Sequence, residues 1–189
     1  MTDTVDHEAT APITGGLGPA RKAAIVVGAV IVAMIGLFLV SSPEDSHDRE
    51  VTDLLRQRAP EVSGLAIDGR TFDIDDHRGQ WVLVNFFATW CPGCVNEHPD
   101  LVELEAWGIE NNNLELVSVV FNDPVDQVEL FFQQRGGTWP VLNSPQVPIE
   151  FEVAQIPETF LVSPAGQVVL HVQGEVRSGD IIDFIEAST

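Results

Sequence analysis

The chain has 189 residues, of which 29 are acidic and nine are basic, so its formal net charge is −20. This balance argues against nucleic-acid binding, which needs a basic patch to displace counterions from phosphate. A hydrophobic content of 44% excludes a chain that is disordered throughout, and two cysteines are too few for a multi-disulfide scaffold or a four-cysteine zinc site. The composition therefore predicts an acidic globular domain with an appendage.

An uncharged apolar stretch occupies residues 23–40. As a helix it would be about 27 Å long, close to the ~30 Å hydrocarbon core of a bilayer, so we expect a transmembrane helix that acts as a signal anchor. Arg21 and Lys22 precede the stretch and the next basic residue is Arg49, which predicts a cytoplasmic N-terminus. The alternative is a signal peptide cleaved before Pro43, although the apolar stretch exceeds the usual core of about 7–15 residues.

This topology divides the chain into four parts. Residues 1–22 are expected to form a cytoplasmic tail, 23–40 the transmembrane helix, 41–59 a polar linker, and 60–189 a folded domain outside the cytoplasm. The expected location is the cell membrane, crossed once.

Within the domain, apolar runs alternate with segments of helical spacing. A small hairpin is expected at 65–74 around Asp68–Gly69. Strands are predicted at 81–87, 114–121, 159–162 and 168–172, and helices at 91–107, at 123–134 and from a capping Ser178 onward. Alternating strands and helices imply parallel crossovers, while the turn at 163–166 adds a hairpin. The predicted fold class is α/β, with a central mixed sheet flanked by helices.

Two cysteines, in Cys91-Pro92-Gly93-Cys94, directly follow the first buried strand and open the first helix. A helix N-terminus carries partial positive charge and free N–H groups, which stabilise a thiolate. Cys91 occupies this end, so we expect it to be the more exposed sulfur with the lower pKa. Cys94, one turn further, can resolve a mixed disulfide within the same molecule. The spacing predicts a redox-active pair.

Other roles compete with redox chemistry at this pair. A structural staple is a poor explanation because so short a loop restricts the unfolded chain by only about 2 kcal/mol. A zinc site lacks a second cysteine pair, and the histidines are scattered singly. Covalent haem attachment requires a histidine where Val95 stands. We therefore expect no metal and no cofactor. Trp90 either shields one side of the cysteines or serves in packing.

Residues 60–187 resemble the thioredoxin-like superfamily. The segment WVLVNFFATWCPGC at 81–94 matches its strand, active-site loop and helix, and Ile156–Pro157 corresponds to its cis-proline. The resemblance implies a thioredoxin-like fold with Cys91–Cys94 as the redox-active disulfide. It also implies that Trp90, Ile156 and Pro157 contact the substrate.

Within the superfamily, the chain looks like the membrane-anchored TlpA/ResA and CcmG/DsbE reductases. Asn85 stands where thioredoxin has a buried aspartate, and an asparagine in this strand is usual in these relatives. Glu97 matches their active-site glutamate. On a helix Glu97 shares a face with Cys94, so a catalytic role in proton transfer is available. The alternative is an ordinary solvated residue in the first turns of a helix.

Two later segments bear on the branch. Pro157–Phe160 is close to the PETF signature of the cytochrome c maturation branch, although Gln155–Ile156 stand where that branch usually has a glycine. Residues 124–151 resemble the helix and strand that this group inserts into the fold.

The resemblance implies an extracytoplasmic thiol–disulfide oxidoreductase that reduces apocytochrome c before haem attachment. Its electrons would come from a membrane thiol transporter of the CcdA/DsbD kind. One alternative is a disulfide oxidant or isomerase, and another is a non-enzymatic module that binds a client through its cysteines. A peroxiredoxin shares the fold, but its cysteine lies in a different local motif.

Overall fold

The computed structural model describes residues 28, 31 and 54–188. The chain divides into two units, 1–46 and 47–189. The predicted tail, transmembrane helix and most of the linker lie outside the described residues, apart from Gly28 and Ile31, which are helical. Among the described residues, no helix has the length and apolar character needed to cross a bilayer.

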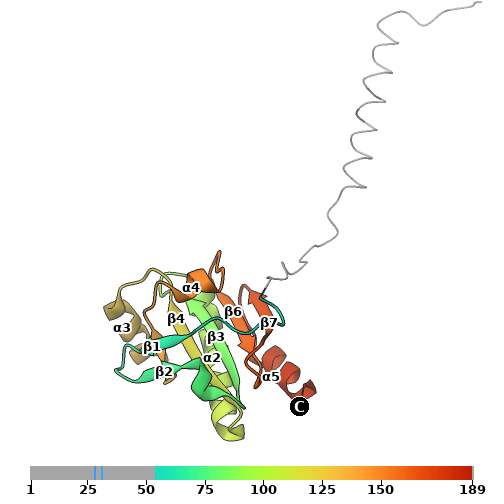
Figure 1. The fold of residues 1–189 in the computed structure, drawn as a ribbon. Coiled ribbons are helices and arrows are strands. Elements are labelled where there is room, and N and C mark those ends of the chain that lie inside the picture. Colours follow the sequence, from blue (N-terminus) through green and yellow to red (C-terminus); the bar gives the residue numbers. More distant parts are fainter. Residues whose placement is uncertain (1–27, 29–30, 32–53, 189) are drawn as a thin grey trace, which may run out of the picture. The chain divides into compact units, whose positions relative to one another are not determined.

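A five-stranded sheet organises the folded domain (Figure 1). Its strands follow the spatial order β5 (Val141–Leu142), β4 (Leu114–Val120), β3 (Trp81–Phe87), β6 (Glu158–Val162), β7 (Val168–Gln173). The β3–β4 and β4–β5 pairs are parallel, whereas β3–β6 and β6–β7 are antiparallel. All residues of β3 are buried because this strand lies at the centre of the sheet, which explains its nearly continuous apolar run. The predicted mixed sheet is confirmed.

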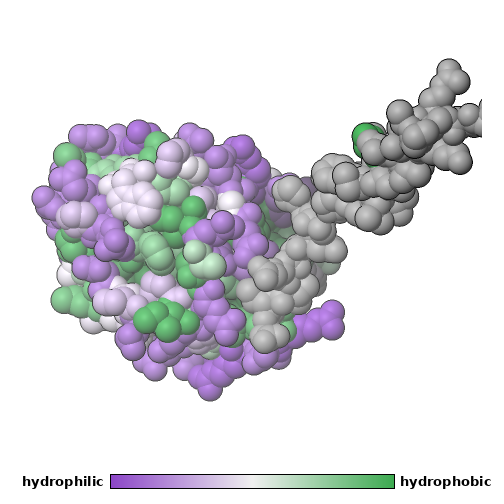
Figure 2. All heavy atoms as spheres, turned by 90° about the horizontal axis from the view of Figure 1, so that it is seen from above, coloured by the Kyte–Doolittle hydropathy of each residue, from purple (hydrophilic) through white to green (hydrophobic). Residues whose placement is uncertain are grey.

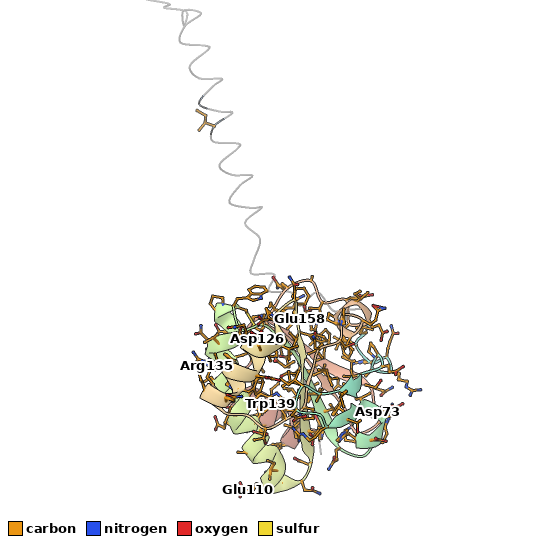
Figure 3. All side chains as sticks on the ribbon, turned by 90° about the vertical axis from the view of Figure 1, so that its left-hand side faces the viewer. Asp73, Glu110, Asp126, Arg135, Trp139 and Glu158 are labelled. Atoms are coloured by element: carbon orange, nitrogen blue, oxygen red, sulfur yellow. A yellow bond between two sulfur atoms is a disulfide. The ribbon has the colours of Figure 1, made fainter. Side chains whose placement is uncertain are left out.

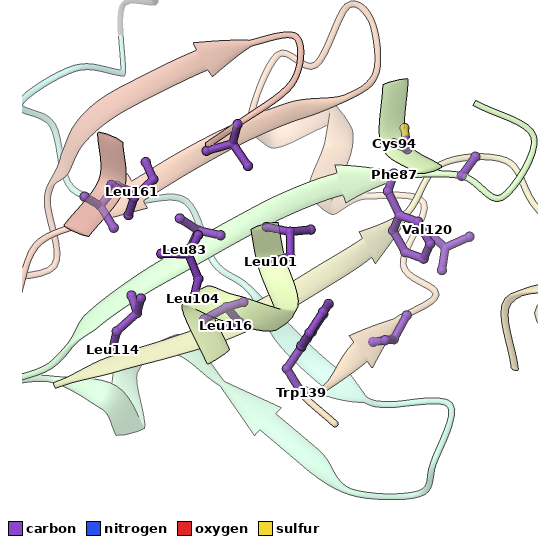
Figure 4. Packing of buried hydrophobic residues seen from close by; sticks show 14 of the residues in the cluster. Leu83, Phe87, Cys94, Leu101, Leu104, Leu114, Leu116, Val120, Trp139 and Leu161 are labelled. Atoms are coloured by element: carbon purple, nitrogen blue, oxygen red, sulfur yellow. The ribbon is translucent and has the colours of Figure 1, made fainter. Parts of the chain in front are cut away.

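Each face of the sheet has its own hydrophobic cluster. Alternation along β3 directs Leu83 and Phe87 into one cluster and Val84 and Phe86 into the other. The first cluster includes residues of the helices α2 (Pro92–Asn111), α3 (Val125–Arg135) and α5 (Ser178–Ala187). Figure 4 shows this cluster, with Leu101 of α2 among the side chains of the strands.

The second cluster is covered by shorter elements. These are the hairpin β1 (Ser63–Leu65) and β2 (Thr71–Asp73), the 3-10 helix η1 (Ile74–His77) and the short helix α4 (Val147–Glu150). The hairpin turns at Gly69, whose φ is +85°, and Gly69 N–H donates to Ala66 O. This confirms the turn that Asp68–Gly69 predicted.

Three details differ from the sequence-based expectations. The folded domain begins before residue 60, because Leu54 and Leu55 pack against the second cluster and Ala59 belongs to it. Residues 54–59 therefore join the folded domain through their apolar side chains, although most residues of the expected linker are polar. The first residue of α5 is Ser178, and the cap is Arg177. The order predicted from residue patterns also lacked β5 and α4, which are two and four residues long, although the family resemblance indicated an inserted helix and strand.

Candidate active site

The two cysteines lie where β3 passes into α2. Cys91 caps the helix, Pro92 occupies its first turn, and the backbone N–H of Cys94 donates to Cys91 Sγ over 3.2 Å. Proline suits this position because its ring presets the helical φ and the missing N–H has no partner there anyway. Cys91 and Cys94 form a disulfide, with their Cα atoms 5.3 Å apart. Of the two sulfurs, Cys91 Sγ therefore receives the helix N–H bond, the arrangement that favours a thiolate.

Cys91 is the more exposed of the two cysteines, as expected, but both are buried in this disulfide form. Cys91 is 4% exposed and Cys94 2% exposed, because both belong to the first hydrophobic cluster. Trp90, by contrast, is 57% exposed, and its indole N–H donates to Asn122 O over 3.2 Å. Trp90 therefore stands on the surface beside the cysteine loop, and the packing alternative for this residue is wrong.

Pro157 lies directly against the cysteine motif. The Ile156–Pro157 peptide bond is cis, as the family resemblance implied. A Cβ added to Gly93 would lie 3.0 Å from Pro157 Cδ, so the loop approaches the proline closely because residue 93 has no side chain. Ile156 is half-buried and packs against both hydrophobic clusters. The structure thus brings the cysteine loop and the cis-proline together.

Glu97 is fully buried one turn after Cys94 in α2. Its Oε1 accepts from Asn85 Nδ2 over 2.8 Å, and its Oε2 accepts from the backbone N–H of Val176 over 2.9 Å. Burial raises the pKa of Glu97 from 4.5 to about 7, against the lowering effect of those two hydrogen bonds. The solvated alternative is therefore wrong. A carboxyl with a pKa near neutrality is suited to exchange protons with a thiol.

Asn85 belongs to a row of polar residues across the three central strands. In the sheet register it stands opposite Ser118 of β4 and Thr159 of β6, and all three are 1% exposed. Asn85 Nδ2 also donates to Thr159 Oγ1 over 3.1 Å, while Ser118 Oγ–H donates to Asn85 Oδ1 over 3.3 Å. Through Asn85, this row supplies one of the two hydrogen bonds that Glu97 accepts, and the backbone N–H of Val176 supplies the other.

A groove of about 670 Å³ lies beside the exposed Trp90. Its lining includes Asn122, Asp123 and Ile149, the last of which is 69% exposed. Asp123 Oδ2 accepts from the backbone N–H of Thr89 over 2.5 Å and so ties the β4–α3 loop to the segment before the cysteines. Viewed from above, apolar residues gather among hydrophilic ones on this side of the domain (Figure 2).

Sequence reasoning missed several of these contacts. The sequence pattern indicates only a helix start at Asp123 and a buried strand at Ser118, and neither pattern predicts the contacts of these side chains. A buried pair on β6 and β7 was also missed: Glu158 Oε1 and His171 Nε2 are 2.5 Å apart, and Glu158 Oε2 has no hydrogen-bond partner. Figure 3 shows Glu158 near the upper end of the domain. For the residues in strands, the available signal was a polar side chain within a largely apolar run: Ser118 in β4, Glu158 in β6 and His171 in β7.

In the part of the chain that the structure describes, no group of three or more histidine, cysteine or acidic side chains could hold a metal ion.

A disulfide at the start of the helix that follows the central strand, with a cis-proline against it, defines a thiol–disulfide oxidoreductase of thioredoxin-like fold. The sequence agrees: the chain belongs to the AhpC/TSA family, which it matches over residues 55–171. The thiol:disulfide interchange protein HelX of Rhodobacter capsulatus is 28% identical over 162 residues, which cover 83% of this chain and 89% of that protein. The thiol-disulfide oxidoreductase ResA of Geobacillus thermodenitrificans is 30% identical over 131 residues, covering 68% and 75%.

Solved structures give the same result. The crystal structure of a thiol:disulfide interchange protein from Chlorobium tepidum has a TM-score of 0.64 and 27% identity, and the match covers 69% of this chain and 94% of that one. The chain is thus a thiol–disulfide oxidoreductase of the ResA, DsbE and HelX kind.

Proposed function

We propose that the chain is a membrane-anchored disulfide reductase that acts outside the cytoplasm on apocytochrome c before haem attachment. One observation carries the exchange chemistry: a fully buried carboxyl, Glu97, stands one helical turn behind the resolving cysteine, with a pKa of about 7. The reducing direction is proposed from the resemblance to the TlpA/ResA and CcmG/DsbE reductases. The PETF-like segment at Pro157–Phe160 supports the choice of client by resemblance.

The reaction begins from the reduced pair. The Cys91 thiolate, stabilised by the Cys94 N–H, attacks one sulfur of the client disulfide and releases the other as a thiolate. Cys94 then loses its proton to the Glu97 carboxylate and attacks Cys91 Sγ, which frees the second client sulfur. The client gains two electrons, and the chain is left with the Cys91–Cys94 disulfide. Pro157 beside Gly93 positions the client backbone at the attacking sulfur.

Cysteine variants test the order of attack. Cys94→Ser should trap client mixed disulfides on Cys91, whereas Cys91→Ser should trap none. The matched serine substitutions differ only in which sulfur remains. Rapid alkylation of Cys94 alone in the reduced protein would reverse the assignment.

The reduction potential tests the direction of electron flow. A reductant should have a potential near that of thioredoxin, about −270 mV, whereas an oxidant should lie near about −120 mV. Equilibration with glutathione buffers measures it, since about 30 mV shifts this two-electron equilibrium tenfold. A potential near the oxidant value would refute the reductase function and favour a disulfide oxidant or isomerase.

Client and location need separate tests. An oxidised peptide with the haem-attachment pattern CxxCH should be reduced faster than a peptide with the same cysteine spacing and no histidine.

For location, a phosphatase fused after Thr189 should be active outside the cytoplasm, and activity of only a cytoplasmic reporter there would refute the topology. We further propose that a membrane thiol transporter of the CcdA/DsbD kind re-reduces Cys91–Cys94; deleting such a transporter should leave the pair oxidised in cells.

A further inference from the structure

A chain of buried hydrogen bonds runs from Glu97 to Trp139, which follows α3 and precedes β5. Trp139 Nε1–H donates to Ser118 Oγ over 2.8 Å, Ser118 Oγ–H donates to Asn85 Oδ1, and Asn85 Nδ2 donates to Glu97 Oε1. Each member of the chain is at most 4% exposed. Water therefore does not compete for these bonds.

The indole fixes the direction of donation along this series of hydrogen bonds. Trp139 Nε1–H can only donate, so Ser118 Oγ accepts from it and has its own proton left for Asn85. That proton requires the carbonyl side of the Asn85 amide, Oδ1, to face Ser118. The NH₂ side must then face Glu97 and Thr159. If a group that can accept a hydrogen bond replaced the indole, Ser118 Oγ–H could donate to that group and Ser118 Oγ could accept from Asn85. The Asn85 amide would then be free to turn over.

Packing fixes Trp139 in place. Gly137, with φ of +93°, lets the chain turn so closely under the indole that a Cβ there would come within 2.6 Å of the ring. The ring also contacts His98 and Phe132, with centroids 5.5 and 5.3 Å away. Figure 4 shows Trp139 well apart from Cys94 within the same cluster, and Figure 3 shows it in the middle of the domain. An effect of Trp139 on the cysteines must therefore pass through other residues.

We propose that Trp139 and Ser118 are positioning residues for thiol–disulfide exchange: they hold the Asn85 amide with its NH₂ toward Glu97 and so set how readily Glu97 takes a proton. This role rests on the proposed function of Glu97 as the proton acceptor for Cys94. An N–H directed at the carboxyl favours its charged form, whereas a carbonyl directed there favours the protonated form. The charges that face Glu97 are those of Asp100 on α2 and Glu175 before α5, and both favour protonation. Of the two Glu97 partners, only the Asn85 amide can reverse its effect, because the second is the backbone N–H of Val176.

The test measures Glu97 directly. In protein carrying carbon-13 in its glutamate carboxyl groups, the Glu97 resonance is followed by NMR from pH 4 to 9 in the oxidised wild type and in Trp139→Phe and Ser118→Ala. Both variants should move the midpoint to higher pH by about one unit, a tenfold change, because the amide is then free to turn. Trp81→Phe is the matched control: it changes another indole of the same cluster that lies outside the chain of bonds, and its midpoint should stay at the wild-type value. Unchanged midpoints in Trp139→Phe and Ser118→Ala would overturn the proposal.

A second readout connects the effect to exchange. The rate of client disulfide reduction, measured against pH, should shift in Trp139→Phe in parallel with the NMR midpoint. In a Glu97→Gln background, Trp139→Phe should leave the pH profile of exchange unchanged. A persistent shift in that background would also overturn the proposal, because Trp139 would then act by another route. If Glu97→Gln alone leaves the wild-type profile unchanged, the proposed catalytic function of Glu97 fails, while the NMR result still decides the positioning role.

Discussion

Replacing Glu97 by glutamine should change how the stability of the oxidised protein depends on pH. Burial raises the folded-state pKa of Glu97 to about 7, against 4.5 for an ordinary glutamate. Between these values the folded protein holds a proton that the unfolded chain has released. The free energy of unfolding therefore falls as pH rises from about 4.5 through about 7, and the full loss is about 3 kcal/mol.

Glutamine removes the titration but also removes an acceptor. Glu97 accepts from Asn85 Nδ2 and from Val176 N–H, and an amide offers an oxygen to only one of them. At pH 4.5 we therefore expect Glu97→Gln to be less stable than the wild type by about 1–3 kcal/mol. That difference should shrink by about 3 kcal/mol at pH 8, where the wild type bears the cost of a buried charge.

Urea unfolding at five pH values from 4.5 to 8.5, with the disulfide intact, measures both proteins. Other groups titrate in this range, since burial raises the pKa of Glu115 and lowers that of His98. Their contributions cancel in the difference between wild type and variant. A difference that stays constant across the range would refute a raised pKa for Glu97.

Three further predictions concern other parts of the domain. Gly93→Ala should slow client reduction by about tenfold, because its Cβ crowds Pro157, while Gly179→Ala, which meets no atom within 4 Å, should not. His171→Leu should cost about 3 kcal/mol in urea unfolding at pH 7, because it leaves Glu158 buried without its partner; an unchanged midpoint would contradict that pairing. Reduction of a basic CxxCH peptide should slow by about tenfold or more from low salt to 1 M, while a neutral analogue keeps its rate; parallel curves would leave the surface charge a solubility feature.

Local patterns in the sequence were enough to locate the redox pair and the sheet. The apolar run of β3 followed by Cys91-Pro92-Gly93-Cys94 predicts a buried strand that enters a helix, and both are present. A turn signal is also local, and Asp68–Gly69 correctly predicted the hairpin of β1 and β2. Short elements such as β5, with two residues, carry too few positions for a pattern to be seen.

The surroundings of Glu97 could not be predicted in the same way. Its spacing from Cys94 showed only that the two share a helix face, which fits a solvated residue as well as a buried one. Whether Glu97 is buried or solvated depends on residues far away in the chain. Asn85 and Val176 donate hydrogen bonds to Glu97, and Asn85 in turn accepts one from Ser118. Contacts of this kind follow from sheet register and helix packing, which no single segment determines.

The acidic residues of this chain act at two different ranges. Residues 43–189 contain 26 acidic and seven basic residues, a net charge of −19. Charges in contact with water interact over about 8–10 Å at physiological salt and are screened beyond it, so they affect how fast a client arrives. Glu97 is shielded from solvent, and its pKa is set mainly by burial, which salt does not screen. Salt should therefore change client association and leave the pH profile of the exchange step in place, whereas Glu97→Gln should change the profile and leave the salt dependence. The two effects can be separated in one protein by varying salt and pH independently.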